Sequence, residues 1–175
     1  MRNKINTGIL VLGLMLISGS AFADWGTRVE DDAFNDGHTA MMFGAEIAMR
    51  GIAFDCSNDT LSVSYIEQAD TKDVVDGIPA DLVLKVDKNP SVKLKAQTVA
   101  RNSDYLGVKA DNADELKVLL AQLKQAKRQV LVGVRFPDAD KKMSFTLNTV
   151  GSTTAVNKFI KACNIDLPAL DAKKK

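Results

Sequence analysis

The sequence predicts a mostly β protein with two appended helices (α+β), built as an antiparallel β-sandwich or open barrel with one disulfide. Apolar and polar residues alternate with a period of two over most of the chain, which is typical of half-buried strands. Only two stretches change to helical spacing, so repeated βαβ units do not fit. The two cysteines, Cys56 and Cys163, are the only ones in the chain.

The composition is that of an ordinary globular protein. The chain has 175 residues, of which 46% are hydrophobic and 26% are charged. Its 23 Lys and Arg residues nearly balance its 22 Asp and Glu residues. This balance argues against a disordered chain and against a nucleic-acid binder that relies on bulk positive charge.

Residues 1–23 have the three parts of a cleaved export signal. Arg2 and Lys4 form a basic start, residues 8–17 form an apolar run too short to span a bilayer, and Ala21 and Ala23 are the small residues of a cleavage site. We therefore expect cleavage between Ala23 and Asp24. An uncleaved membrane anchor is the alternative reading.

Removal of the signal leaves 152 residues with 21 basic and 22 acidic side chains, because Arg2 and Lys4 are its only charged residues. This length is enough for one domain with a sizeable core, which we place at 24–170. The basic tail 171–175 should be disordered. We expect the mature chain to be soluble, in a bacterial periplasm or outside the cell, with no stable membrane insertion.

The first half of the mature chain predicts strands and one clear hairpin. A strand over 25–30 precedes a turn-rich loop at 31–37, and a longer apolar strand over 38–49 bends near Gly44. The alternation over 52–66, interrupted by turn residues at 57–60, predicts a hairpin in which Cys56 points inward.

The second half predicts a connection, a second hairpin and three further strands. Residues 67–80 have no periodicity and read as an exposed connection. Residues 82–97 form a hairpin whose lysines face water, and 105–110 form a shorter strand. After the first helix, the alternation predicts strands over 130–136 and 143–147.

Two segments have helical periodicity. The first helix is expected over about 113–127, with Asn112 as its cap and Glu115 completing a capping box. The second is expected to begin at Ser152 as cap. Its apolar stripe combines four residues at helical spacing, Val156, Phe159, Ile160 and Cys163.

Cys56 and Cys163 are expected to form one structural disulfide. Both lie on apolar faces, and a cysteine pair in an oxidising compartment is usually bridged. Metal or redox-catalytic use would need a local C-x-x-C spacing or additional ligands, and the chain has neither.

No residue pattern supports a catalytic, cofactor or metal site. His38 is the only histidine and has no G-x-S-x-G partner motif. His38, Met41 and Met42 are soft ligands that could bind Cu(I). Neighbouring residues of a strand point to opposite faces, so only one of the two methionines could share a face with His38. We therefore expect no catalytic residues, no cofactor and no bound metal, with the methionines in the core.

The charged clusters read as solvated surface. Asp70, Asp73 and Asp76 lack the register of a calcium loop, and no context selects a carboxylate pair for glycoside chemistry. The basic run 124–128 fits the end of a helix better than an anion site.

Both ends of the mature chain resemble a known group of proteins. The stretch 149–156 followed by 158–163, which ends at Cys163, looks like the closing strand, turn, helix and cysteine of small exported bacterial β-sandwich proteins. Trp25 with the run 31–34 is similar to their start. These are the type VI secretion-associated periplasmic proteins and, more loosely, the invasion-associated locus B family. The resemblance implies a non-enzymatic accessory or binding role in the cell envelope, and it carries no functional residues.

The sequence thus favours a periplasmic or secreted protein that binds another envelope or secreted protein, as an accessory, inhibitor or immunity factor. A small-ligand or metal binder that uses the interior of the β-structure is the alternative. An enzyme with an unrecognised site ranks last, and no nucleic-acid partner is expected.

Overall fold

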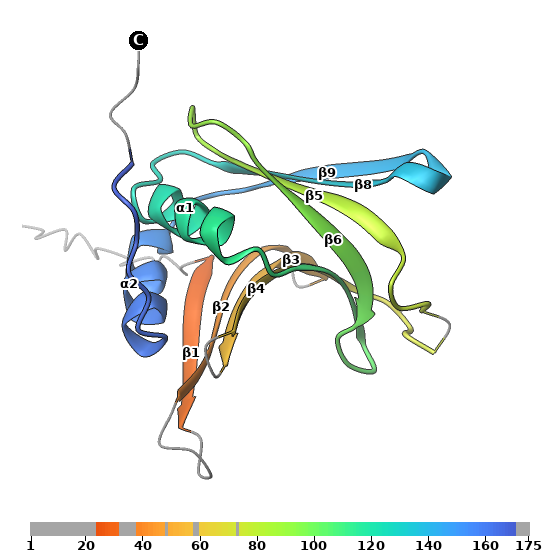
Figure 1. The fold of residues 1–175 in the computed structure, drawn as a ribbon, viewed down its shortest axis with the longest axis horizontal. Helices are drawn as coiled ribbons and strands as arrows, with labels where there is room; N and C mark the ends of the chain where they lie inside the picture. Colours follow the sequence, from red (N-terminus) through yellow and green to blue (C-terminus); the bar gives the residue numbers. More distant parts are fainter. Residues whose placement is uncertain (1–23, 32–37, 48, 58–59, 73, 171–175) are drawn as a thin grey trace, which may run out of the picture.

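In the computed structural model, the described residues are 24–31, 38–47, 49–57, 60–72 and 74–170. They form one nine-stranded antiparallel sheet and two helices (Figure 1). The strands are adjacent in the order β1-β2-β3-β4-β7-β6-β5-β8-β9. The predicted α+β class with mostly strands is confirmed, and the architecture is a curled sheet, or half-barrel.

The bounds of the strands follow the predicted alternation closely. They are β1 (Trp25–Asp31), β2 (His38–Ile47), β3 (Arg50–Ser57), β4 (Thr60–Gln68), β5 (Pro79–Val86), β6 (Val92–Ala100), β7 (Tyr105–Ala110), β8 (Val130–Phe136) and β9 (Lys141–Leu147). A short 3₁₀ turn, η1 (Pro137–Ala139), joins the last two strands. Both predicted hairpins are confirmed, and a β-bulge in β2 lies between Ala45 and Ile47, just after the expected bend.

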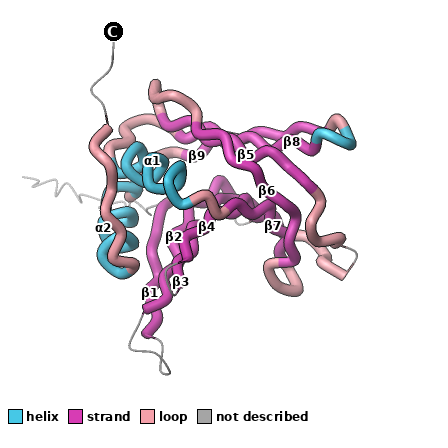
Figure 2. The backbone as a smooth tube through the Cα atoms, in the orientation of Figure 1, coloured by secondary structure: helices cyan, strands magenta, loops and turns pink. Residues whose placement is uncertain are grey.

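Strand β6 is where the sheet curls. Residues 92–97 pair with β5, whereas residues 97–100 pair with β7, so one strand joins two differently oriented parts of the sheet (Figure 2). At one end, the two outermost strands are tied together. The Trp25 indole N–H donates to the Asn148 carbonyl at 2.8 Å, and the Trp25 backbone N–H donates to Val150 at 3.2 Å. The half-barrel is therefore nearly closed where both helices lie.

The core lies on the inner face of the sheet, beneath the helices (Figure 1). Alternate residues of every strand from β2 to β9 point there, and many have no exposed surface. Examples are Met42, Phe54, Val63, Leu82, Val108 and Val132. Burial of a single such side chain contributes about 1.5–3 kcal/mol relative to exposure. The buried side chains of the described residues form one continuous hydrophobic core.

Helix α1 (Ala113–Lys124) begins where predicted and ends earlier than predicted. It begins after Asn112, whose side chain makes no capping hydrogen bond, so the predicted capping box is wrong. The helix ends three residues before the predicted 127, because the backbone N–H groups of residues 127–129 donate to the Asp87 carboxylate instead of to helix carbonyls. Leu116, Leu119, Leu120 and Leu123 form its buried face, as predicted.

Helix α2 (Ser152–Ala162) packs against β1 and β2 and carries the disulfide. Gly151, with φ of 85°, is its cap, so the prediction that Ser152 caps the helix is wrong. A left-handed residue is needed where the chain turns into α2, and glycine adopts that conformation without a Cβ penalty. Ser152 is instead buried in the first turn.

The disulfide between Cys56 and Cys163 is confirmed. It joins β3 to the residue that caps the end of α2, across 107 positions of sequence. Next to it, the rings of Phe54 and Phe159 meet edge to face, with their centroids 6.4 Å apart. Covalent and apolar contacts thus hold α2 on the sheet at the same place.

Trp25 packs flat against the backbone of the neighbouring strand at Gly44. A Cβ built on Gly44 would lie 2.6 Å from two atoms of the Trp25 indole. The indole is 2% exposed, and its N–H is paired. The absence of a side chain at Gly44 therefore allows Trp25 to fill this corner of the core.

Some expectations concern residues that the structure does not describe. Three of them lie outside the described residues: the expected signal that precedes Asp24, most of the loop at 31–37, and the tail 171–175. The connection predicted at 67–80 is confirmed in its middle, since β4 ends at Gln68 and β5 begins at Pro79. Within the described ranges, no helix has the length and apolar character needed to cross a bilayer.

We expect Cys163→Ala to lower the free energy of unfolding by about 2–5 kcal/mol, because the disulfide closes a long loop in the unfolded chain. Urea denaturation measures this loss, and hydrogen exchange should show α2 opening first. Cys56→Ala should have a similar effect. Equal protection of α2 in the variant and the wild type would contradict the expectation.

We expect Gly44→Ala to destabilise the protein by about 1–3 kcal/mol, because the new methyl group displaces the Trp25 indole. Fluorescence of this single tryptophan reports the displacement directly. Gly133→Ala is the matched control in another strand, since the nearest atom to its Cβ would be 3.9 Å away. Similar losses for both variants would rule out the packing argument.

Candidate binding sites

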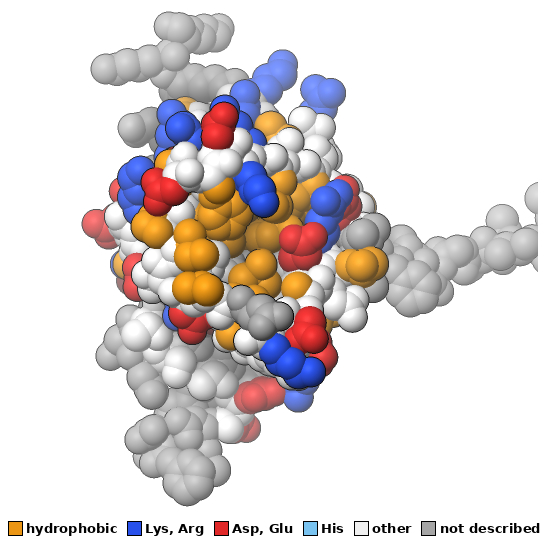
Figure 3. Space-filling model, turned by 90° about the vertical axis from the view of Figure 1, so that its right-hand side faces the viewer, with side chains coloured by type: hydrophobic (Ala, Val, Ile, Leu, Met, Phe, Trp, Pro, Cys, Tyr) orange, Lys and Arg blue, Asp and Glu red, His pale blue; other side chains and the backbone are white. Residues whose placement is uncertain are grey.

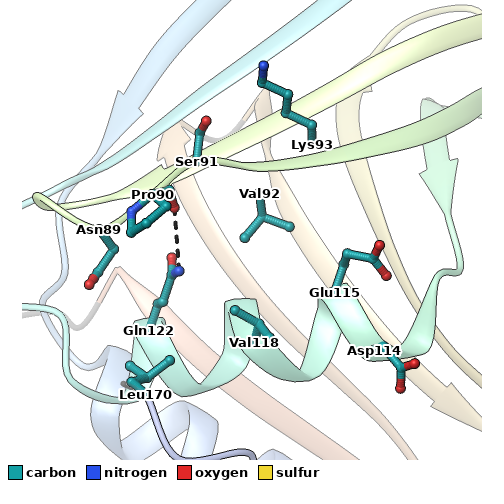
Figure 4. Close-up of a pocket in the computed structure, with 10 residues that line it drawn as sticks. All are labelled: Asn89, Pro90, Ser91, Val92, Lys93, Asp114, Glu115, Val118, Gln122 and Leu170. Carbon is teal, nitrogen blue, oxygen red and sulfur yellow. Dashed lines mark hydrogen bonds between the residues drawn. The ribbon is translucent and has the colours of Figure 1, made fainter. Parts of the chain in front are cut away.

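A groove lies between α1 and the turn that joins β5 to β6 (Figure 4). Its volume is about 500 Å³, within the range of pockets that bind small molecules. It is lined by residues of the turn, of β6, of α1 and of the last described part of the chain: Asn89, Pro90, Ser91, Val92, Lys93, Asp114, Glu115, Val118, Gln122 and Leu170.

Asp87 fixes the two sides of this groove relative to each other. It begins the β5–β6 turn with φ of 51°, and its backbone N–H donates to the Gln129 carbonyl at 2.9 Å. Its carboxylate accepts three backbone hydrogen bonds of 2.8–2.9 Å, from residues 127–129 after α1. The turn is thereby bonded directly to the segment that ends α1.

The hydrogen bonds also set the charge state of Asp87. Partial burial opposes ionisation of this carboxyl, but the N–H donors of Gln129, Lys127 and Arg128 favour the anion more strongly. The pKa of Asp87 is therefore below its usual value. The carboxylate stays ionised at neutral pH and the turn remains anchored.

The walls of the groove are apolar, and its charged groups lie at one end. Val92 and Val118 face each other across it, from β6 and from α1 (Figure 4). The Glu115 carboxylate lies at one end, whereas the Lys93 side chain points away from α1. A ligand would therefore meet apolar walls and an acidic end.

Gln122 closes the other end of the groove and has an unsatisfied oxygen. The residue is only 4% exposed. Its Nε2 donates to the Pro90 carbonyl at 3.4 Å, a long hydrogen bond (Figure 4). Its Oε1 is buried and has no hydrogen-bond partner within the described part of the protein. A buried acceptor without a donor is costly, which makes this atom unusual.

A second apolar surface lies at the end of the half-barrel opposite the helices. Ile78, Phe136 and Met143 continue the inward-facing rows of β5, β8 and β9 beyond the part of the sheet that the helices cover. Ile78 is 40% exposed and Met143 is 36% exposed. In Figure 3, hydrophobic side chains gather in the middle of this end, with charged side chains around them. We call these three residues the mouth.

On the outer face of the sheet, Arg101 and Asp55 form a bidentate ion pair. Both guanidinium nitrogens donate to the carboxylate, at 2.7 and 2.8 Å, from residues 46 positions apart. The Asp55 carboxylate raises the pKa of Arg101. The pair lines a polar cavity of about 580 Å³.

Near the mouth, a second group of polar residues is also paired. Arg50 bonds to Glu46, and its guanidinium lies over the Phe145 ring, 5.1 Å from the centroid. The Tyr65 hydroxyl donates to Glu67 at 2.7 Å. Burial, and then the hydrogen bond to Glu67, raise the pKa of Tyr65, so the phenol is protonated at any ordinary pH.

The structure places the two methionines of the suggested copper motif on opposite faces of β2. Met42 is buried in the core with no exposed surface, as expected for a methionine of this strand. Met41 is half-buried on the other face, so the prediction that it packs in the core is wrong; its Sδ is 3.3 Å from an Arg101 nitrogen. The His38 backbone pairs with Asp31, and its side chain is outside the described atoms.

Of the three aspartates of the connection, the two that the structure describes accept hydrogen bonds from different parts of the backbone. Asp70 accepts from the Lys72 backbone at 3.1 Å, and Asp76 accepts from the Ala100 backbone at 2.7 Å. Asp73 is not among the described residues. Among the described residues, no group of three His, Cys, Asp or Glu side chains is placed to hold a metal ion.

Comparison with known proteins finds no relative of this chain. No protein-family model, no curated protein and no solved structure matches the chain. The groove and the mouth are both sites that sequence reasoning missed. Their residues come from distant elements and carry no local motif.

We expect Asp87→Asn to lower the free energy of unfolding by about 1 kcal/mol at neutral pH, since it weakens charge-assisted hydrogen bonds at a partly exposed site. Asparagine tolerates the left-handed backbone, so the change isolates the charge. Because the pKa of Asp87 is depressed, its contribution is full above the unfolded pKa of about 3.9 and is lost as the pH falls through the lower folded pKa.

Urea denaturation of both proteins from pH 7 to pH 2 checks this expectation. The difference between wild type and variant should shrink at the acid end. A difference that is constant over the whole range would show that the carboxylate charge has no role.

Proposed function

We propose that the protein is an exported, non-enzymatic protein that binds another envelope or secreted protein, as an accessory, inhibitor or immunity-type factor. The observation that carries this proposal is the mouth of the half-barrel. Here Ile78, Phe136 and Met143 extend the apolar inner face into solvent. The disulfide and the resemblance of the chain ends to exported bacterial β-sandwich proteins support an envelope location.

The exposed mouth favours recognition of a protein surface. The same inward-facing rows are fully buried at the helix end, where Val86 and Val130 have no exposed surface. A partner that covers the mouth would remove apolar area from water, which is worth about 25 cal/mol per Å². Apolar centres surrounded by charged side chains are typical of protein interfaces.

The polar clusters support binding over catalysis. Arg101 and Asp55 satisfy each other, and Tyr65 donates to Glu67 and is held protonated. The raised pKa values of Arg101 and Tyr65 make both groups poor proton donors near neutral pH. The alternative of a small-ligand or metal binder that uses the interior of the sheet has less support, because that interior is filled by side chains beneath both helices.

A photo-crosslinking amino acid placed at Ile78 or at Met143 should capture the same envelope protein in intact cells, because both positions lie at the mouth. The product is identified by mass spectrometry. Leu131 is the control: it is 41% exposed and lies on β8 as well, but on the outer face and at the end of the strand away from the mouth.

The control position should give at most background crosslinks. Met143→Asp in the otherwise unchanged protein should abolish the Ile78 crosslink without unfolding the protein. The proposal would be wrong if neither mouth position crosslinked, or if Leu131 captured the same protein equally well.

A further inference from the structure

We propose that the groove between α1 and the β5–β6 turn docks an extended apolar peptide segment. The segment donates a main-chain N–H to Oε1 of Gln122 and places a basic side chain beside Glu115. This inference rests on the proposed function, since the segment belongs to a protein partner, but it uses a surface separate from the mouth. Three features of the groove carry it.

The first feature is the unpartnered oxygen of Gln122. The residue is 96% buried and lines the groove, and its Oε1 has no hydrogen-bond partner among the described residues. A buried acceptor of this kind is stabilised by any donor that reaches it. Main-chain N–H groups of an extended peptide are such donors, and every residue except proline supplies one.

The second feature is the size of the groove. Glu115 and Gln122 are seven residues apart on α1, which places them about 10 Å apart along the axis. An extended chain covers that distance with about three residues. Such a chain is about 10 Å long, and strand and sheet spacings give it a cross-section of about 4.8 by 10 Å, so it fills roughly 480 Å³. The groove has about 500 Å³, whereas a helix of that length needs roughly 800 Å³.

The third feature is the distribution of charge and apolar surface. Val92, Val118 and Pro90 provide apolar walls, so apolar side chains are favoured in the middle. Asp114 and Glu115 occupy the first turn of α1, and Lys93 points away from the groove (Figure 4). The end opposite Gln122 therefore favours a cationic side chain.

The probe is the tetrapeptide acetyl-Leu-Val-Leu-Lys-amide, titrated into the full mature protein and followed by NMR. We expect saturable shifts of the Val92 and Val118 methyl groups. Replacement of the peptide lysine by glutamate should weaken binding about threefold or more. Among peptides N-methylated at one internal amide each, at least one should lose about tenfold in affinity, because it lacks the donor for Gln122.

Gln122→Met tests the oxygen in the protein itself. We expect this variant to bind the peptide about tenfold more weakly and to lose the discrimination against the N-methylated peptide. The melting temperature of the free variant should change little, because the substitution removes the unpaired buried oxygen together with the long hydrogen bond from Nε2 to the Pro90 carbonyl. Gln125→Met is the matched control, as the exposed residue that caps the end of the same helix, and it should leave affinity unchanged.

Several outcomes would overturn the inference. These are equal affinity of all N-methylated peptides, full affinity of Gln122→Met, or a lower melting temperature of that variant with unchanged binding. If deletion of residues 171–175, without any peptide, shifted the NMR signals of the Val92 and Val118 methyl groups, the chain's own basic tail would be the occupant. Crosslinks at the mouth without peptide binding here would refute only the groove, and peptide binding without such crosslinks would refute only the mouth.

Discussion

The structure depends on one constraint: a nine-stranded sheet has a continuous apolar inner face, and two short helices cover only part of it. At the covered end, α1 and α2 bury the inward-facing rows completely, and Trp25 ties the outermost strands together. At the other end, the same rows reach solvent at Ile78 and Met143. The core and the proposed interface are thus two ends of one surface.

The elements and the disulfide could be predicted because their signals are local. A period of two marks most of the strands, and a strand places Cys56 on the same face as Ile52 and Phe54. Helical spacing places Cys163 on the stripe of Val156 and Phe159. Because the chain has only two cysteines and both point to the core, each has only the other as a possible disulfide partner. No long-range information is needed for that conclusion.

The sheet order, the groove and the true helix boundaries could not be predicted, because they depend on contacts between distant residues. Asp87 ends α1 early by accepting N–H groups 40–42 positions away. Arg101 forms an ion pair with Asp55, which lies 46 positions away in the sequence. In the sequence, Gln122 is one polar residue on an amphipathic helix. Only the closing of the β5–β6 turn over α1 makes its oxygen a buried, unpaired group.

The mouth and the groove differ in the contacts that fix the positions of their residues. The mouth is carried by β5, β8 and β9, whose backbone ladders are continuous and independent of the disulfide. The groove has α1 as one wall, and the Thr153 hydroxyl on α2 donates to the Lys124 carbonyl at the end of α1, at 2.9 Å. Because Cys56 and Cys163 hold α2 on the sheet, the position of the groove wall depends on the covalent link. Reduction should therefore loosen the groove while leaving the mouth intact, so an oxidising compartment matters more for one surface than for the other.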